Sequence, residues 1–228
     1  AHEAVRVQLD RAKLALRTGR PDEAEALGAE ALARARATSP SDEVLLGLAL
    51  STAGETALLR EDLAASERFF REAAELYQRV SGPDHAATAL ANTNLAIVLH
   101  RLGRWAEAEQ LGRAALRGTR ANFPPGSLEV ASVASNLATG LQNLRKYEEA
   151  DALFQEALTI RRRVFPPGHR VMAQALFNLG FVKVRRGEND AATALLDEAI
   201  RAYEQLDGPD CNAVLKCRAT LARVERTY

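Results

Sequence analysis

Three asparagines recur at a fixed spacing of 42 residues, and they are the side chains of this chain best suited to contact a partner. They are Asn94, Asn136 and Asn178. An amide carries both a donor and an acceptor, so it can hydrogen-bond to the backbone of an extended peptide whatever the peptide's sequence. A helix interior disfavours Asn without a compensating contact. The chemistry that this pattern indicates is recognition of a peptide.

Positions three and seven residues after each asparagine lie on the same face of a helix. On this stripe Arg101 and Arg185 can meet carboxylates, and Phe181 can anchor a ligand side chain. Gln174 lies one turn before Asn178. We therefore predict an amide-lined, locally basic groove that binds an acidic protein or peptide segment, formed by Asn94, Arg101, Asn136, Asn143, Gln174, Asn178, Phe181 and Arg185.

A structural role is the alternative for the same residues. The asparagines could hydrogen-bond to neighbouring helices and stabilise the array, while the arginines stay solvated. Phe181 and Ile97 could be packing residues that reach only the floor of the groove. The two interpretations predict opposite effects of removing an asparagine on binding and on stability.

Patterns for catalysis or metal binding are absent from the sequence. It has no H-E-x-x-H, no G-x-S-x-G and no phosphate loop. His85 and His169 stand at equivalent positions 84 residues apart, which favours helix-start residues over a metal pair. Cys211 and Cys217 lack the second pair that a zinc site or a disulfide framework needs. We expect no enzyme activity, no metal and no cofactor.

Composition limits the partners and the fold. The 228 residues include 30 basic and 30 acidic side chains, so no net charge attracts nucleic acid or an anionic membrane. Hydrophobic residues make up 47% and aromatic residues 5%, which suits close helix packing. No apolar run is long enough for a membrane span, and the cysteine usage favours a cytoplasmic location. The chain begins at Ala1 and its only methionine is Met172, so we expect a segment of a longer protein.

The elements that position these residues repeat with the same period. An unbroken alanine column stands at Ala31, Ala73, Ala115, Ala157 and Ala199. A period of this length is typical of a solenoid of stacked helix pairs. Repeats are predicted at 1–42, 43–84, 85–126, 127–168 and 169–209, with a closing helix at 210–228, all in one array over 1–228. Within them the pattern predicts helices at about 3–17, from Pro21 to the linker 38–42, and at 43–60, 62–80, 85–102, 104–121, 127–144, 146–164, 169–186, 188–206 and 210–227.

Three charged residues depart from the pattern. Arg11, Lys183 and Arg186 stand where other repeats have leucine. Terminal repeats of a solenoid have a more polar outer face, so these residues are predicted to cap the array. Its ends are expected to be less stable than its middle.

The motifs resemble the tetratricopeptide repeat. They are N-L-A at residues 94–96 and 136–138, N-L-G at 178–180, the turn G-R-W-A-E-A at 103–108 and A-L at 115–116. The 42-residue period resembles the variety found in kinesin light chains and in bacterial signalling proteins, and we expect a bacterial member. The resemblance implies an all-α fold, a right-handed superhelix of helix-turn-helix repeats.

The resemblance also implies a function. It is a protein-interaction scaffold that binds a peptide or protein segment in its concave groove, as part of a larger signalling or regulatory protein. The alternative is a self-association element that builds a homo-oligomer, which the neutral net charge permits.

Overall fold

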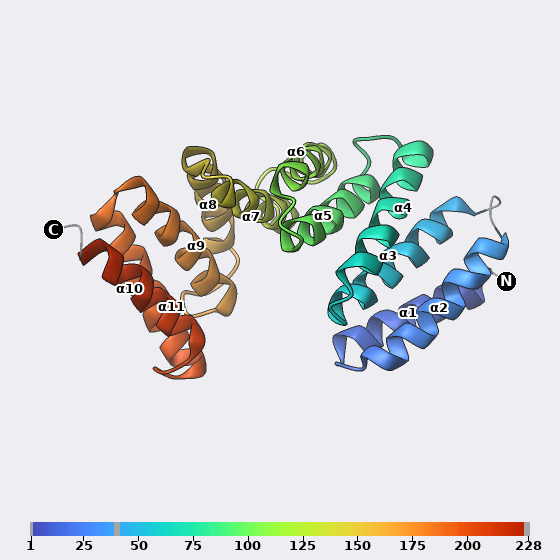
Figure 1. Ribbon diagram of the computed structural model, residues 1–228, viewed down its shortest axis with the longest axis horizontal. Helices are drawn as coiled ribbons and strands as arrows, with labels where there is room; N and C mark the ends of the chain where they lie inside the picture. The colour runs from blue at the N-terminus through green and yellow to red at the C-terminus, as the bar shows by residue number, and fades with distance from the viewer. Residues whose placement is uncertain (1, 39–41, 226–228) are drawn as a thin grey trace. The chain divides into compact units, whose positions relative to one another are not determined.

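The described part of the chain is entirely helical. A computed structural model describes residues 2–38 and 42–225, which form eleven α-helices and no strand (Figure 1). The helices are α1 (His2–Arg17), α2 (Pro21–Thr38), α3 (Glu43–Leu59), α4 (Leu63–Ser81), α5 (Ala86–Arg101), α6 (Trp105–Asn122), α7 (Leu128–Asn143), α8 (Tyr147–Arg162), α9 (Arg170–Arg186), α10 (Asn189–Asp207) and α11 (Asn212–Glu225). The prediction of an all-α fold built from helix-turn-helix repeats is confirmed. The predicted linker residues 39–41 and the end of the predicted closing helix, 226–227, lie outside the described residues.

The helices group into two compact units, residues 1–122 and 123–228. The first unit contains α1 to α6 and the second α7 to α11. Odd-numbered helices are the first helices of the repeats, here called A helices, and even-numbered helices are the second, here called B helices. Each A helix packs against the B helix that follows it, except α11, which ends the described chain. A single array over 1–228 stays a prediction.

The turn from A helix to B helix has the same backbone in every repeat. Gly19, Gly103 and Gly187 adopt left-handed conformations with φ of 71°, 76° and 75°. At the equivalent positions Glu61 and Arg145 adopt φ of 63° and 59°. A left-handed conformation is unfavourable for a residue with a Cβ atom. The packing of the helix pair therefore imposes the turn even where the sequence has no glycine.

Side chains cap the helices at the predicted starts. Asp42 accepts a hydrogen bond from the Leu45 amide (2.9 Å) at the start of α3. His85 and His169 precede α5 and α9, and each Nδ1 accepts a backbone N–H two residues on, at 3.1 and 3.2 Å. These bonds satisfy amides that have no partner within the helix. The prediction that both histidines are helix-start residues is confirmed.

The alanine column forms the packing seam within each unit. Its members, Ala31, Ala73, Ala115, Ala157 and Ala199, are at most 1% exposed. In the α3–α4 and α9–α10 pairs, glycine on the A helix permits a still closer approach. A Cβ atom on Gly54 of α3 would lie 2.8 Å from the Phe70 ring of α4, and one on Gly180 of α9 would lie 2.9 Å from Leu196 of α10. Small residues on the A helices thus make room for large buried residues on the B helices.

The prediction that Lys183 and Arg186 cap the array is wrong, because both take part in an ion cluster inside the second unit. Lys183 is only 8% exposed, and its Nζ lies 3.0 Å from Oδ1 of the buried Asp151. An Arg186 guanidinium nitrogen lies 2.6 Å from Oδ2 of the same carboxylate. Glu188 pairs with Lys183 at 2.6 Å. These ion pairs therefore join α9 to α8. Of the three charged residues that depart from the pattern, only Arg11 has the expected outward position, because it is exposed on α1.

Candidate functional site

The candidate site of the second unit lies on its A helices. Helices α7, α9 and α11 follow one another, and α9 contacts both of the others. Asn136 is exposed on α7 and makes no side-chain hydrogen bond with any described residue. Asn143 is half-buried in the last turn of α7 and has an interaction partner. Of the two, Asn136 is the amide available to a ligand.

On α9 the predicted residues form a connected row. Gln174 Nε2 donates a hydrogen bond to Asn178 Oδ1 (2.9 Å), and the Tyr203 hydroxyl of α10 donates to Gln174 Oε1 (3.2 Å). Burial raises the pKa of Tyr203 to about 12, so this hydroxyl keeps its proton at neutral pH. These two hydrogen bonds hold the Gln174 side chain in place. The amide nitrogen of Asn178 takes part in neither of them.

Phe181 and Arg185 lie together at the end of α9, in a cleft against α11. The Arg185 guanidinium carbon is 5.3 Å from the centre of the Phe181 ring, within the range of a cation–π contact. The cleft has a volume of about 270 Å³. Arg185 is exposed and forms no ion pair with a carboxylate among the described residues. The arrangement offers an apolar ring and an unneutralised positive charge at one place.

The other two predicted residues belong to the first unit. Asn94 is half-buried on α5, without a side-chain hydrogen bond to any described residue. An Arg101 guanidinium nitrogen lies 3.6 Å from Oε1 of Glu61 in the α3–α4 turn. The Arg101 side chain is 39% exposed and that of Glu61 82%, so solvent screens this pair and it is weak. Arg101 therefore has a competing carboxylate, whereas Arg185 has none in the described part of the chain.

Sequence reasoning missed the contribution of α11 to the cleft. Thr220 and Arg223 line it, together with Asn189 at the start of α10. The repeat period contained the signal, because Thr220 stands 42 residues after Asn178. The periodicity within α9 was enough to find Phe181 and Arg185. It could not find Thr220 and Arg223, because these residues come from the next A helix, α11.

The described residues form neither a membrane-spanning helix nor a metal-binding cluster. No helix in ranges 2–38 and 42–225 is long and apolar enough to cross a bilayer. The same ranges contain no group of three or more histidine, cysteine, aspartate or glutamate side chains arranged to hold a metal ion.

Comparison with known proteins identifies the family. The tetratricopeptide repeat model matches residues 45–121 and 129–205. No curated protein sequence matches. The chain belongs to the tetratricopeptide repeat family, whose members are generally scaffolds for protein interactions rather than enzymes.

Solved structures share the fold. BtubC from P. vanneervenii is 25% identical with a TM-score of 0.75, and the match covers 88% of this chain and 80% of BtubC. The repeats of a candidate kinesin light chain from Podosopora anserina are 14% identical with a TM-score of 0.75, covering 91% of this chain and 98% of that one. YrrB, described as a TPR protein with an unusual peptide-binding site, is 18% identical with a TM-score of 0.59, covering 93% and 90%.

Proposed function

We propose that the second unit binds an extended acidic peptide across α7, α9 and α11, as the recognition part of a larger signalling or regulatory protein. The observation that carries the proposal is the exposed Arg185 stacked on Phe181 in the α9–α11 cleft. A guanidinium without a carboxylate partner is ready to meet an aspartate or glutamate of the ligand. The likeness of the fold to YrrB, which has a peptide-binding site, supports the same conclusion.

The size of the cleft indicates how the peptide is held. At about 270 Å³ it is smaller than pockets that enclose a drug-sized ligand, roughly 300–1,000 Å³. It can therefore take one side chain against the Phe181 ring while the rest of the peptide lies over the helices. Asn136 and Asn178 stand at equivalent positions on α7 and α9, where their amides can hydrogen-bond to the peptide backbone.

A peptide library selected on the purified chain tests this proposal. We expect hits that contain Asp or Glu and whose binding weakens with salt, because exposed ion pairs are screened over a Debye length of about 8 Å at physiological ionic strength. Arg185→Glu should weaken these hits by about tenfold or more, the effect of losing a charge-assisted hydrogen bond. The matched control is Arg201→Glu on the exposed side of α10, which should leave the affinity unchanged. Acidic hits that bind Arg185→Glu as tightly as the parent would refute the proposed site.

Asn136→Ala separates the binding role of the asparagines from the structural one. A binding role predicts weaker peptide affinity, by about 0.5–1.5 kcal/mol for a lost hydrogen bond, with an unchanged melting temperature. The structural role predicts a lower melting temperature with unchanged affinity. The lack of a hydrogen-bond partner for Asn136 among the described residues favours the first result.

Self-association is the second candidate, and one observation on α1 favours it. Val7 and Leu14 are 52% and 54% exposed. At the equivalent positions of later A helices, Ala49 and Val98 are fully buried. An apolar face that is covered in other repeats is thus open on α1. Light scattering of the parent and of Leu14→Glu tests this candidate, and an equal monomer mass for both would exclude it.

A further inference from the structure

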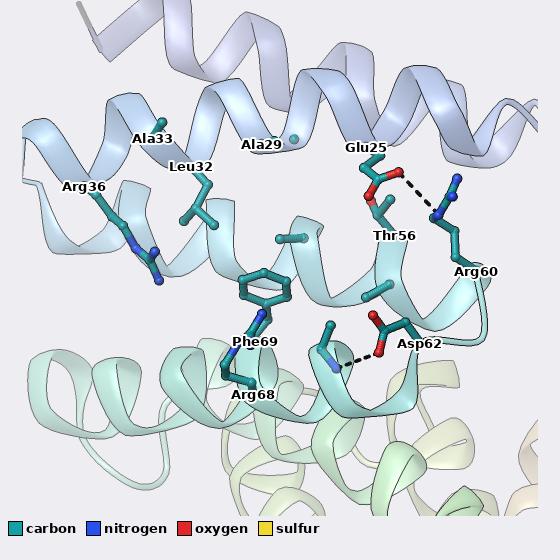
Figure 2. A pocket seen from close by; sticks show the side chains of 14 residues that line it. Glu25, Ala29, Leu32, Ala33, Arg36, Thr56, Arg60, Asp62, Arg68 and Phe69 are labelled. Atoms are coloured by element: carbon teal, nitrogen blue, oxygen red, sulfur yellow. Dashed lines mark hydrogen bonds and ion pairs between the residues drawn. The ribbon is translucent and has the colours of Figure 1, made fainter.

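The first unit contains a second cavity, on the side of its B helices. It is a groove of about 410 Å³ between α2 and α4, with α3 as its floor (Figure 2). Its volume is within the range of pockets that hold small ligands or peptide side chains, about 300–1,000 Å³. The groove is built from the first unit alone, so it is independent of the α9–α11 cleft.

The groove exists because three positions of the repeat pattern carry small residues. They are Gly28, Ala53 and Ala57, all of which line the groove. One repeat later the equivalent positions hold large side chains that are at most 2% exposed: Phe70, Leu95 and Leu99. A Cβ atom built on Gly28 would meet no other atom within 4 Å. The space that the next repeat fills with its own side chains is therefore left open.

Apolar surface and positive charge meet at one end of the groove. Leu32 of α2 and Phe69 of α4 face each other across it (Figure 2). The Arg68 guanidinium carbon lies 5.1 Å from the centre of the Phe69 ring. Arg68 is exposed and forms no ion pair with a carboxylate in the described part of the chain. This end can hold a bulky apolar side chain and an adjacent carboxylate together.

The other charges of the groove are already paired. Arg36 donates to Glu72 at 2.8 Å, which ties α2 to α4. Arg60 lies 3.3 Å from Glu25, and the Asp62 carboxylate caps α4 by accepting the Ala65 amide (Figure 2). These contacts leave Arg68 as the positive charge that a ligand can neutralise.

We propose that the α2–α3–α4 groove is a second binding site, for a peptide segment that places a bulky apolar side chain next to Asp or Glu. The apolar side chain fills the space above Gly28, Ala53 and Ala57 and packs on Phe69. The carboxylate pairs with Arg68. The chain thereby holds two separate acidic segments, one on the A helices of the second unit and one on the B helices of the first.

Two substitutions test the site by filling it and by reversing its charge. Gly28→Phe introduces the side chain that the next repeat has at the equivalent position, Phe70. Arg68→Glu replaces the positive charge of the groove by a negative one. A peptide library displayed on phage is selected on the intact chain, and the hits are titrated against both variants by fluorescence anisotropy. Arg117→Glu on the exposed side of α6 is the charge-matched control, and Arg185→Glu identifies hits that use the α9–α11 cleft instead.

The proposal expects a class of hits with an apolar residue beside Asp or Glu. Their affinity should fall by about tenfold or more for Arg68→Glu, the effect of losing a charge-assisted hydrogen bond. Gly28→Phe should abolish their binding, whereas Arg117→Glu and Arg185→Glu leave it intact. Should Gly28→Phe fail to fold by circular dichroism, Ala57→Leu fills the same groove with the residue type of Leu99. A library without any hit sensitive to both the filling and the charge reversal overturns the proposal, as does a preference of this groove for basic peptides.

Discussion

Replacing Asp151 with alanine should strongly destabilise the second unit. Asp151 is buried on α8, and its carboxylate balances both Lys183 and Arg186 of α9. Lys183 Nζ donates a hydrogen bond to Oδ2 at 3.1 Å, while Oδ1 is buried and receives no hydrogen bond from the described residues. Asp151→Ala would leave the Lys183 ammonium buried with one partner, Glu188, at 2.6 Å.

The magnitude follows from what remains after the substitution. Removing one partner of a buried ion pair costs about 3–5 kcal/mol, because the other charge stays buried without compensation. Glu188 still pairs with Lys183, so we expect the lower end of this range, about 3 kcal/mol. Replacing both charges should cost less than the two single changes together, by about 0.5–3 kcal/mol, since the groups contact each other. Lys183→Leu is the natural second substitution, because Leu141 stands at the equivalent position of the preceding A helix.

Urea unfolding followed by circular dichroism measures these free energies. The series is the parent, Asp151→Ala, Lys183→Leu and the double variant, with Glu148→Ala on the surface of α8 as control. The control should change the free energy of unfolding by less than about 1 kcal/mol. A loss below about 1 kcal/mol for Asp151→Ala, or single effects that add within about 0.5 kcal/mol, would refute the buried cluster.

The cluster also predicts a pH dependence. The hydrogen bond from Lys183 lowers the pKa of Glu188 below its ordinary value of 4.5, against the opposing effect of burial. A lowered pKa means that the native state holds the charged form more strongly than the unfolded chain does. The stabilisation is therefore present above pH 4.5 and is lost as the pH falls through the lowered pKa. Glu188→Gln should remove this part of the acid sensitivity in melting experiments between pH 3 and 7.

Three further predictions concern backbone, packing and thiol chemistry. Arg145→Gly should raise the free energy of unfolding by about 0.5–1 kcal/mol. Glycine removes a left-handed strain of about 1–2 kcal/mol, but it also has more conformational entropy in the unfolded chain, which offsets part of this gain. An unchanged melting temperature would contradict this prediction. Gly54→Ala should cost roughly 1–3 kcal/mol, since its Cβ would lie 2.8 Å from the buried Phe70 ring; a stabilised variant would show that the helix pair can open. Burial raises the pKa of Cys217 to about 11, so iodoacetamide at pH 8 should label Cys211 much faster, and equal rates measured by mass spectrometry would contradict the burial.

The repeat pattern predicted the positions of the helices well because each helix buries the same positions of the 42-residue repeat. The alanine column fixed the phase of every B helix, and the helix-start residues His85 and His169 marked two of the A helices. Left-handed turns at Glu61 and Arg145 could not be read locally, since neither residue type favours that conformation. They could be inferred from Gly19, Gly103 and Gly187 at the same place in the period.

The candidate sites were harder to predict because they depend on neighbouring helices. Phe181 and Arg185 could be found along α9, but the cleft needs Thr220 from α11. Lys183 was misread because its partner Asp151 lies 32 residues earlier, on the preceding B helix. The α2–α3–α4 groove was missed because its sequence signal is a set of small residues, Gly28 and its neighbours in the groove. No charged, polar or aromatic motif marks these positions.

Hydrogen exchange of the parent chain with and without a selected acidic peptide tests the central claim most directly. Binding on the A helices of the second unit predicts slower amide exchange in α9 and α11, greatest near Phe181 and Arg185, and no such change in Arg185→Glu. Exchange that stays the same in α9 and α11 while the peptide is bound would contradict the proposed site.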